Sequence, residues 1–245
     1  MKILFSPSEM KSQVSASAKF SLDNFIFPSL KEKREFVLNA YENFILSASF
    51  EELSKLFGTK DEKSVEYYKK SFKSNLGIKA VLRYDGVAYK ALDYRSLDLN
   101  SQKYIDENVL IFSNLYGVLK ADTPLPDYKF KQGEKFSELK IENFYKETFS
   151  KSLDEALEHE DILDLRAGFY DKFYSIKKEF LTLKFIKNGK VVSHFAKHYR
   201  GIVLREIAKK NVLNFQEFQE VEFQNLKLVE LKNIKNKREM VLSIL

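Results

Sequence analysis

The chain has 245 residues, of which 44% are hydrophobic, with only eight Gly and four Pro. This composition excludes a disordered, collagenous or low-complexity protein and is sufficient for a full hydrophobic core. Without cysteine, disulfides, thiolate metal sites, iron–sulfur clusters and cysteine nucleophiles are excluded, which is compatible with a reducing compartment. The first apolar run ends at Pro7 and no stretch approaches a membrane span, so we expect no signal peptide, no membrane contact and a cytoplasmic location.

The net charge favours anionic partners. Lys and Arg number 41 and Asp and Glu 35, giving 41 − 35 = +6. Residues 147–161 hold six acidic residues and one Lys, whereas residues 197–210 hold five basic residues and only Glu206. This segregation indicates a basic face, for which nucleic acid, phosphorylated metabolites and acidic proteins are all candidate partners. Ordinary solvated helix surfaces would give the same two runs.

The first half of the chain reads as a strand followed by helices. Lys2 to Phe5 predicts a buried strand that leads into the loop Ser6-Pro7-Ser8. Apolar residues at three- to four-residue spacing predict an amphipathic helix over residues 30–48. Ser49 is predicted to cap a second helix, which ends near Gly58. Asp61 is predicted to cap a third helix over residues 61–76.

The remaining pattern alternates strands and helices. We expect strands over 78–84, 108–113 and 161–165, helices over 98–107, 142–159 and 199–210, a Pro-marked loop over 121–127, a hairpin over 181–195 that turns at Asn188-Gly189, and a second hairpin over 226–245. No Gly-, Ser- or Pro-rich linker divides the chain. The sequence therefore predicts one α/β domain (mixed α+β) over residues 1–245, with a central mixed sheet wrapped by helices.

The common catalytic and nucleotide-binding motifs are absent. The glycines stand singly, so there is no Gly-x-Gly-x-x-Gly, Walker A or Gly-x-Ser-x-Gly pattern. His194 and His198 have the helical spacing of two metal ligands, but Phe195 replaces the zinc-protease Glu and no third ligand is near. A hydrogen-bonded or exposed histidine pair is favoured, and we expect no metal and no cofactor.

Three segments combine Tyr, Gly and a basic residue: residues 84–90, 115–120 and 199–201. Aromatic planes, a cation and close backbone approach suit a phosphate or a nucleobase, although Tyr is also a good strand residue and Gly a turn residue. Lys197, Arg200, Arg205 and His198 are expected near the N-terminus of helix 199–210, which would favour anions. Pairing of these cations with acids such as Glu206 is the alternative.

Taken in order, five motifs resemble the YaaA family of peroxide stress proteins over nearly the whole chain. They are Ser6-Pro7, Tyr84…Gly86…Tyr89, the run Asn114-Leu115-Tyr116-Gly117-Val118-Leu119, Pro126-Asp127-Tyr128-Lys129…Gly133, and Phe195-Ala196-Lys197…Arg200-Gly201. The resemblance implies an unusual α/β fold and a bacterial cytoplasmic protein, induced in hydrogen peroxide stress, that limits free iron and protects DNA and proteins. It also implies DNA binding through a positively charged cleft and a helix-hairpin-helix element.

The helix-hairpin-helix element is expected at about residues 49–72, where Lys55 and Lys60 flank a short turn. Plain helix-turn-helix packing would explain this segment equally well. Elsewhere the chain departs from the family. It has Ser8-Glu9 in place of Ala-Lys, with the basic residue displaced to Lys11.

A second departure lies in residues 164–172. Tyr170 and Lys172 match the family, but Ala167 and Phe169 stand where many members have Ser and Glu. Either acid–base chemistry of those two residues is lost, or Asp164, Arg166 or Asp171 has replaced it.

Two functional hypotheses follow. The first is a non-enzymatic, monomeric protein that binds DNA with little sequence preference in a basic cleft. Its expected DNA-binding residues are Lys55, Lys60, Lys120, Lys129, Lys172, Lys197, Arg200, Tyr84, Gly86, Tyr89, Tyr116, Gly117 and Gly201. The second is an enzyme acting on a nucleotide or nucleic-acid base. Its expected pocket comprises Ser6, Tyr116, Tyr170, Lys172 and Lys197. Direct iron sequestration is disfavoured, because the sequence has no thiolates and no clear His or carboxylate cluster.

Overall fold

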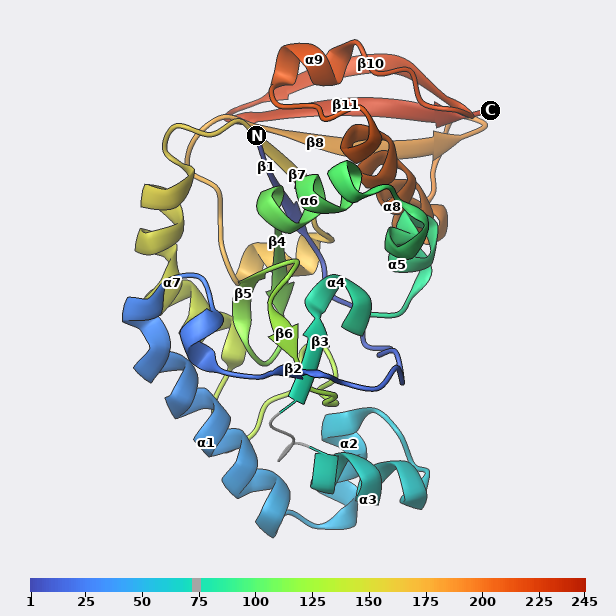
Figure 1. Cartoon of the computed structure of the whole chain (residues 1–245). Coiled ribbons are helices and arrows are strands. Elements are labelled where there is room, and N and C mark those ends of the chain that lie inside the picture. The colour runs from blue at the N-terminus through green and yellow to red at the C-terminus, as the bar shows by residue number, and fades with distance from the viewer. Residues whose placement is uncertain (72–75) are drawn as a thin grey trace.

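The computed structural model describes residues 1–71 and 76–245, apart from the side chains of Ser71, Ser193 and His194. Within these residues, eight strands form one mixed sheet in the order β10-β11-β8-β7-β1-β4-β5, with β9 beside β8 (Figure 1). The strands are β1 (Lys2–Phe5), β4 (Val109–Ser113), β5 (Gly117–Lys120), β7 (Ile162–Leu165), β8 (Phe180–Lys187), β9 (Lys190–Val191), β10 (Leu226–Ile234) and β11 (Lys237–Ile244). A smaller sheet joins β2 (Ala18–Lys19), β3 (Leu76–Lys79) and β6 (Pro124–Leu125). The mixed α/β fold class is confirmed.

Strand β1 lies at the centre of the larger sheet. It pairs in parallel with β4 on one side and with β7 on the other, so that Phe5 lies opposite both Ile111 and Leu165. Ile3 and Leu4 are fully buried, which explains why β1 is a continuous apolar run. Because β4 and β7 flank β1 on opposite sides and run in the same direction, the chain reverses its strand order here. Such a reversal opens a crevice at the carboxyl ends of the strands.

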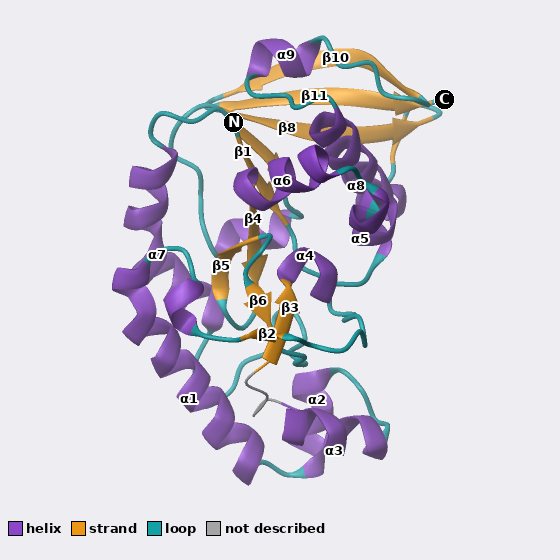
Figure 2. Ribbon diagram, viewed as in Figure 1, coloured by secondary structure: helices purple, strands orange, loops and turns teal. Residues whose placement is uncertain are grey.

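Helices cover both sides of these central strands. The described helices are α1 (Lys31–Ser47), α2 (Phe50–Phe57), α3 (Glu62–Ser71), α4 (Ala80–Arg83), α5 (Val87–Leu92), α6 (Leu99–Asn108), α7 (Ile141–Leu157), α8 (Ser193–Lys209) and α9 (Phe215–Gln219). Figure 2 shows α1 and α7 on one side, α5, α6 and α8 on the other, and α2 with α3 at one end. Among the described residues, none of the helices has the length and apolarity needed to cross a bilayer.

The predicted helix caps around α2 are confirmed. The Ser49 hydroxyl accepts the Glu52 N–H while the Glu52 carboxylate accepts the Ser49 N–H, and Gly58 ends the helix with a left-handed φ of 67°. The Asp61 carboxylate accepts the Ser64 N–H at 2.8 Å and so caps α3. Residues 72–75 of the predicted third helix lie outside the described residues. The helix-hairpin-helix assignment of residues 49–72 stays a prediction.

Two predicted elements are wrong in part. The strand expected over 78–84 ends at Lys79, and residues 80–83 form the short helix α4. The chain turns here because the Arg83 guanidinium points inward, donating to the carbonyl oxygens of Leu125 and Ser12. The helix expected over 199–210 begins six residues earlier, at Ser193, since the hairpin strand before it ends at Val191.

The two predicted hairpins and the sheet's central strands follow the sequence pattern. Asn188 and Gly189 both have positive φ, of 50° and 74°, as a two-residue hairpin turn requires. Strands β10 and β11 form the second hairpin. By contrast, the six-residue helix α5, which borders the pocket described below, was not expected from the sequence.

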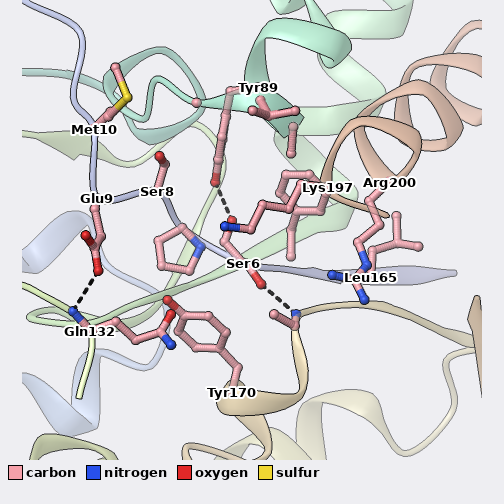
Figure 3. Close-up of a pocket in the computed structure, with 16 residues that line it drawn as sticks. Ser6, Ser8, Glu9, Met10, Tyr89, Gln132, Leu165, Tyr170, Lys197 and Arg200 are labelled. Atoms are coloured by element: carbon pink, nitrogen blue, oxygen red, sulfur yellow. Dashed lines mark hydrogen bonds between the residues drawn. The ribbon is translucent and has the colours of Figure 1, made fainter. Parts of the chain in front are cut away.

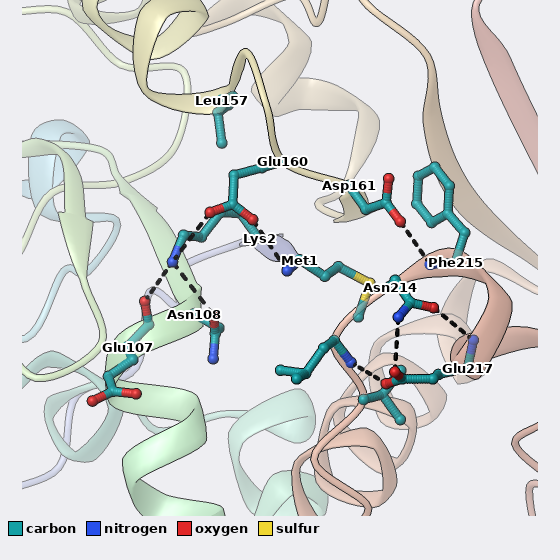
Figure 4. Close-up of polar contacts among 12 residues, drawn as sticks. Met1, Lys2, Glu107, Asn108, Leu157, Glu160, Asp161, Asn214, Phe215 and Glu217 are labelled. Atoms are coloured by element: carbon teal, nitrogen blue, oxygen red, sulfur yellow. Dashed lines mark hydrogen bonds and ion pairs between the residues drawn. The ribbon is translucent and has the colours of Figure 1, made fainter.

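Two adjacent acidic residues, Glu160 and Asp161, contact the start of β1, and Asp161 also contacts α9 (Figure 4). Glu160 lies 3.1 Å from the Met1 ammonium group, and the Asp161 carbonyl accepts the Lys2 N–H at 2.8 Å. The Asp161 carboxylate accepts the Phe215 N–H at 2.7 Å, at the first turn of α9. These contacts hold β1 in the register that aims its carboxyl end at the crevice.

Candidate functional site

A pocket of about 290 Å³ occupies the crevice at the carboxyl ends of β1 and β7. Its walls come from the loops after these strands, from the start of α5 and from α8 (Figure 3). Ser6 joins three of these parts. Its hydroxyl accepts the Ala167 N–H at 2.8 Å, and its carbonyl oxygen accepts the Tyr89 hydroxyl at 2.8 Å. The crevice that the strand order predicts is therefore a built pocket.

Two tyrosines form opposite walls of the pocket (Figure 3). The Tyr170 hydroxyl donates to the Asn114 side-chain oxygen at 3.0 Å, and Tyr89 is held by Ser6. Burial raises the pKa of both phenols well above their ordinary value. Both hydroxyls stay protonated at neutral pH and are already used as donors, so they shape the pocket more than they exchange protons.

Lys197 and Arg200 bring positive charge to the pocket from α8. Neither makes a hydrogen bond or an ion pair with any residue in the described part of the chain. Burial lowers the pKa of the Arg200 guanidinium, yet an arginine remains charged in proteins. Lys197 is exposed, whereas Arg200 is partly desolvated, and a partly desolvated charge without an ion-pair partner among the described residues favours the entry of an anion.

The other end of the pocket carries a carboxylate and an amide. The Glu9 carboxylate accepts the Gln132 backbone N–H at 3.1 Å. The Glu9 carbonyl oxygen accepts both the Lys11 ammonium at 3.3 Å and the Lys129 ammonium at 3.4 Å. Lys129 therefore lies at the rim beside Glu9.

Lys11 lies behind this wall and was noticed in the sequence only as a displaced basic residue. Its ammonium nitrogen is 4.2 Å from the centre of the Tyr128 ring. Burial, with Lys129 as a second cause, lowers the pKa of Lys11 to about 7, although Asp127 and Glu9 oppose the shift. The sequence gives no signal for the burial of Lys11, because the residues around it are far apart in sequence.

Asp164 and Arg166 form a buried, hydrogen-bonded ion pair. The Arg166 guanidinium donates to both carboxylate oxygens of Asp164, at 2.8 and 2.9 Å, and also to the Tyr170 and Tyr174 carbonyl oxygens. The Asp171 carboxylate is 3.6 Å from Arg166. Asp164 and Arg166 are thus committed to holding the turn after β7, which disfavours acid–base chemistry by either.

The structure brings together part of the expected site. The pocket is lined by Ser6, Gly86, Tyr89, Tyr170, Lys197 and Arg200. Lys172 lies near the rim, with its ammonium nitrogen 5.1 Å from the centre of the Phe169 ring. A Cβ at Gly133, next to Gln132, would lie 3.7 Å from the Phe169 ring, so this ring lies beside the loop that carries Gln132.

Other expected residues lie elsewhere. Tyr84 and Tyr116 are buried in the core, where they leave almost no surface for a base. Lys120 is exposed at the far end of β5, near Asp122. Lys55 and Lys60 are exposed on α2 and the turn after it, and α2 is joined to the rim loop because the Lys131 N–H donates to the Leu56 carbonyl at 2.8 Å.

Glycines that were expected to approach DNA have packing roles. A Cβ at Gly201 would lie 2.1 Å from the Ala88 carbonyl oxygen, and one at Gly86 would lie 2.4 Å from the Ser8 hydroxyl oxygen. Gly117 has a φ of 71° and faces the Tyr145 ring. Gly201 and Gly86 therefore let α8 and the loop after β1 close around the pocket.

Within the described side chains, no group of three or more His, Asp or Glu residues is arranged to hold a metal ion. The side chain of His194, one of the two histidines weighed as ligands, lies outside that part.

Comparison with known proteins places this chain among related sequences. The family model for the peroxide stress protein YaaA matches residues 1–231. The chain is 52% identical to the uncharacterized protein Cj0984 of Campylobacter jejuni, over the full length of both. It is 30% identical to a UPF0246 protein of Corynebacterium glutamicum, over 85% of each chain, and 29% identical to the UPF0246 protein SCO2297 of Streptomyces coelicolor, over 84% of this chain and 82% of that protein.

Proposed function

Because this chain belongs to the peroxide stress protein YaaA family, we propose that it serves the peroxide stress response by binding DNA. The protein acts in the cytoplasm, helps to limit intracellular free iron and thereby protects DNA and proteins. Family membership supports the peroxide-related role. The contacts with DNA are argued from the charges at the pocket.

The observation that carries the proposal is the pair of cations, Lys197 and Arg200, beside the pocket, which form no ion pair with the described residues. Lys129 and Lys172 extend positive charge along the rim. Cations that track phosphates bind duplexes with little regard to sequence, because phosphates carry no base information. The carboxylate of Glu9 interrupts this positive rim at one end.

Helices α2 and α3 add a second contact region. Lys55 and Lys60 are exposed there, and the contact between Lys131 and Leu56 fixes α2 against the loop that carries Lys129. A duplex lying on the rim would meet both regions. This arrangement supports phosphate contacts from the turn between the helices.

The test is fluorescence anisotropy of a labelled duplex as a function of salt. The variant Lys197→Ala/Arg200→Ala is compared with Lys103→Ala/Lys151→Ala, which loses the same two charges from exposed positions on α6 and α7. We expect the first variant to lower the log–log salt slope by about 1.8, at about 0.9 per phosphate contact, and the control to leave it unchanged. Equal slopes in all three proteins, or no binding by the parent at about 50 mM salt, would exclude the proposal.

A second candidate function, an enzyme acting on a nucleotide or nucleic-acid base, is favoured by the meeting of Ser6, Tyr170 and Lys197 in one pocket. The two other residues expected for it, Tyr116 and Lys172, lie in the core and near the rim. Ser6→Ala would then abolish turnover of a nucleotide or DNA substrate while leaving duplex affinity unchanged.

A further inference from the structure

The pocket has two chemically different ends. Lys197 and Arg200 reach in from α8 at one end, and Glu9 and Gln132 lie at the other, with Ser6 between them (Figure 3). A simple phosphate site would need only the cationic end. The presence of Glu9 and Gln132 at the opposite end therefore favours a ligand with an anionic group at one end and a hydrogen-bond donor at the other.

Several polar groups in the pocket have unused hydrogen-bonding capacity. Of the Glu9 carboxylate, only Oε1 accepts a hydrogen bond from a described residue, and the Gln132 side-chain amide contacts none. The Ser6 hydroxyl accepts the Ala167 N–H but donates to no described acceptor. A carboxylate accepts only, so its partner in a ligand must be an N–H or O–H donor.

The lining of the pocket is also partly apolar and exposed. Met10 and Val87 line the pocket, and these residues are 55% and 48% exposed. Exposed apolar walls next to a hydrogen-bond acceptor suit a flat ring with an amino group at its edge. Carboxylates recognise the exocyclic amino groups of nucleobases in this way.

The size of the pocket restricts the ligand further. About 290 Å³ lies at the lower end of the range for small-molecule sites, which fits one nucleotide and not a dinucleotide. We propose that the pocket binds a nucleoside monophosphate whose base carries an exocyclic amino group, with its phosphate against Lys197 and Arg200 and its amino group donating to Glu9. The nucleotide is either free or an unpaired residue of a DNA strand.

Glu9 determines specificity in this arrangement. Its carboxylate can only accept a hydrogen bond from the base, whereas an amine at this position could only donate one. The preference for an amino-bearing base therefore rests on this carboxylate. The inference does not depend on DNA binding, because a free mononucleotide suffices to test it.

The first experiment is calorimetric titration of the whole protein, without DNA, with AMP, IMP, CMP and UMP. AMP differs from IMP, and CMP from UMP, by an amino group in place of an oxo group. We expect AMP and CMP to bind at least tenfold more tightly than IMP and UMP, the loss expected for a hydrogen bond to a charged group. Adenosine, which lacks the phosphate, should also bind at least tenfold more weakly than AMP. Absence of saturable AMP and CMP binding up to about 5 mM, or equal affinities within both pairs, would overturn the inference.

Single variants test which end of the pocket binds the base and which end binds the phosphate. Glu9→Gln should bring the AMP-to-IMP affinity ratio close to one, whereas Arg200→Lys should weaken AMP and IMP by the same factor. Glu155→Gln, an exposed acid on α7, is the matched control and should leave both affinities unchanged. Thermal melts verify that each variant folds. An unchanged ratio in Glu9→Gln would remove Glu9 from the site.

A competition experiment distinguishes the two possible sources of the nucleotide, a free nucleotide and an unpaired residue of a DNA strand. The competitor is AMP, added to a labelled duplex that carries a single unpaired adenosine and to a fully paired duplex. Displacement of only the first supports a pocket that accepts a base from DNA. AMP binding without displacement of either supports a free nucleotide. If neither duplex binds while AMP does, the DNA-binding proposal fails and the pocket assignment stands.

Discussion

Gly201 of α8 lies against the backbone carbonyl of Ala88 in α5, so close that a Cβ at position 201 would come within 2.1 Å of that oxygen. The contact brings α8 down onto α5 and places Lys197 and Arg200, on the same face, beside the loop that carries Ser6. The glycine acts on the site through helix packing.

Gly201→Ala should therefore lower the free energy of unfolding by about 1–3 kcal/mol, as overpacking does, despite the better helix propensity of alanine. Urea unfolding measures the change. Gly168→Ala is the control, since a Cβ there meets nothing within 4 Å. If Gly201→Ala is as stable as the parent, the close contact does not constrain α8.

The buried pair of Asp164 and Arg166 should be costly to break. Arg166→Met leaves the Asp164 carboxylate buried without its partner, and we expect a loss of about 3–5 kcal/mol in unfolding free energy. The double variant Asp164→Leu/Arg166→Met should lose much less than the sum of the single changes. Strict additivity in urea unfolding would show that the two side chains are not coupled.

Lys11 should make stability depend on pH. In the unfolded chain its pKa is the ordinary 10.5, whereas in the folded protein burial lowers it to about 7. The unfolded state therefore binds more protons between these values, so the contribution of Lys11 to stability is greatest above pH 10.5 and is lost as the pH falls toward 7.

The unfolding free energy should rise with pH by up to roughly 1.4 kcal/mol per unit between pH 7 and 10.5 relative to Lys11→Met. Urea unfolding of both proteins at pH 7 and pH 9 gives this difference. A parallel pH dependence of the two proteins would mean that Lys11 is charged in the folded state at neutral pH.

The lysines that were expected to bind DNA should differ in their effect on DNA binding, according to their distance from the pocket. Lys172→Ala, near the rim, should reduce the log–log salt slope of duplex binding by about 0.9, because one phosphate contact is lost. Lys120→Ala, near Asp122, should leave the slope unchanged. Anisotropy titrations with the same duplex compare them, and a larger effect of Lys120→Ala would place the DNA elsewhere.

Local chemistry made much of the fold predictable. Ser49, Gly58 and Asp61 act within one helical turn, and their caps form as the sequence indicates. Asn188-Gly189 likewise specifies its hairpin through its own backbone angles. The strand expected through Tyr84 failed because its end is decided by Arg83, whose partners Leu125 and Ser12 are distant in sequence.

The site was predictable only in part for the same reason. Lys197 and Arg200 were expected from their positive charge, and Ser6 from the Ser6-Pro7 motif. The sequence could not show that Tyr116 is buried in the core or that Asp164 pairs with Arg166. The expected anion site at Lys197 and Arg200 stays a prediction, although Lys197 lies one turn inside α8 because the helix begins at Ser193.

The central position of β1 also affects the order in which the protein folds. Strand β1 is synthesised before both of its neighbours and can pair with them only when residues near 110 and 163 have been made. Until then its apolar run is unpaired, and pairings between such distant segments form slowly. The bond between Ser6 and Ala167 spans 161 residues, so the pocket is completed late in folding. A nascent chain that stops before Ala167 would lack Ala167, Tyr170, Lys197 and Arg200 from the pocket lining. It would also leave a strand edge exposed, which makes it prone to aggregation.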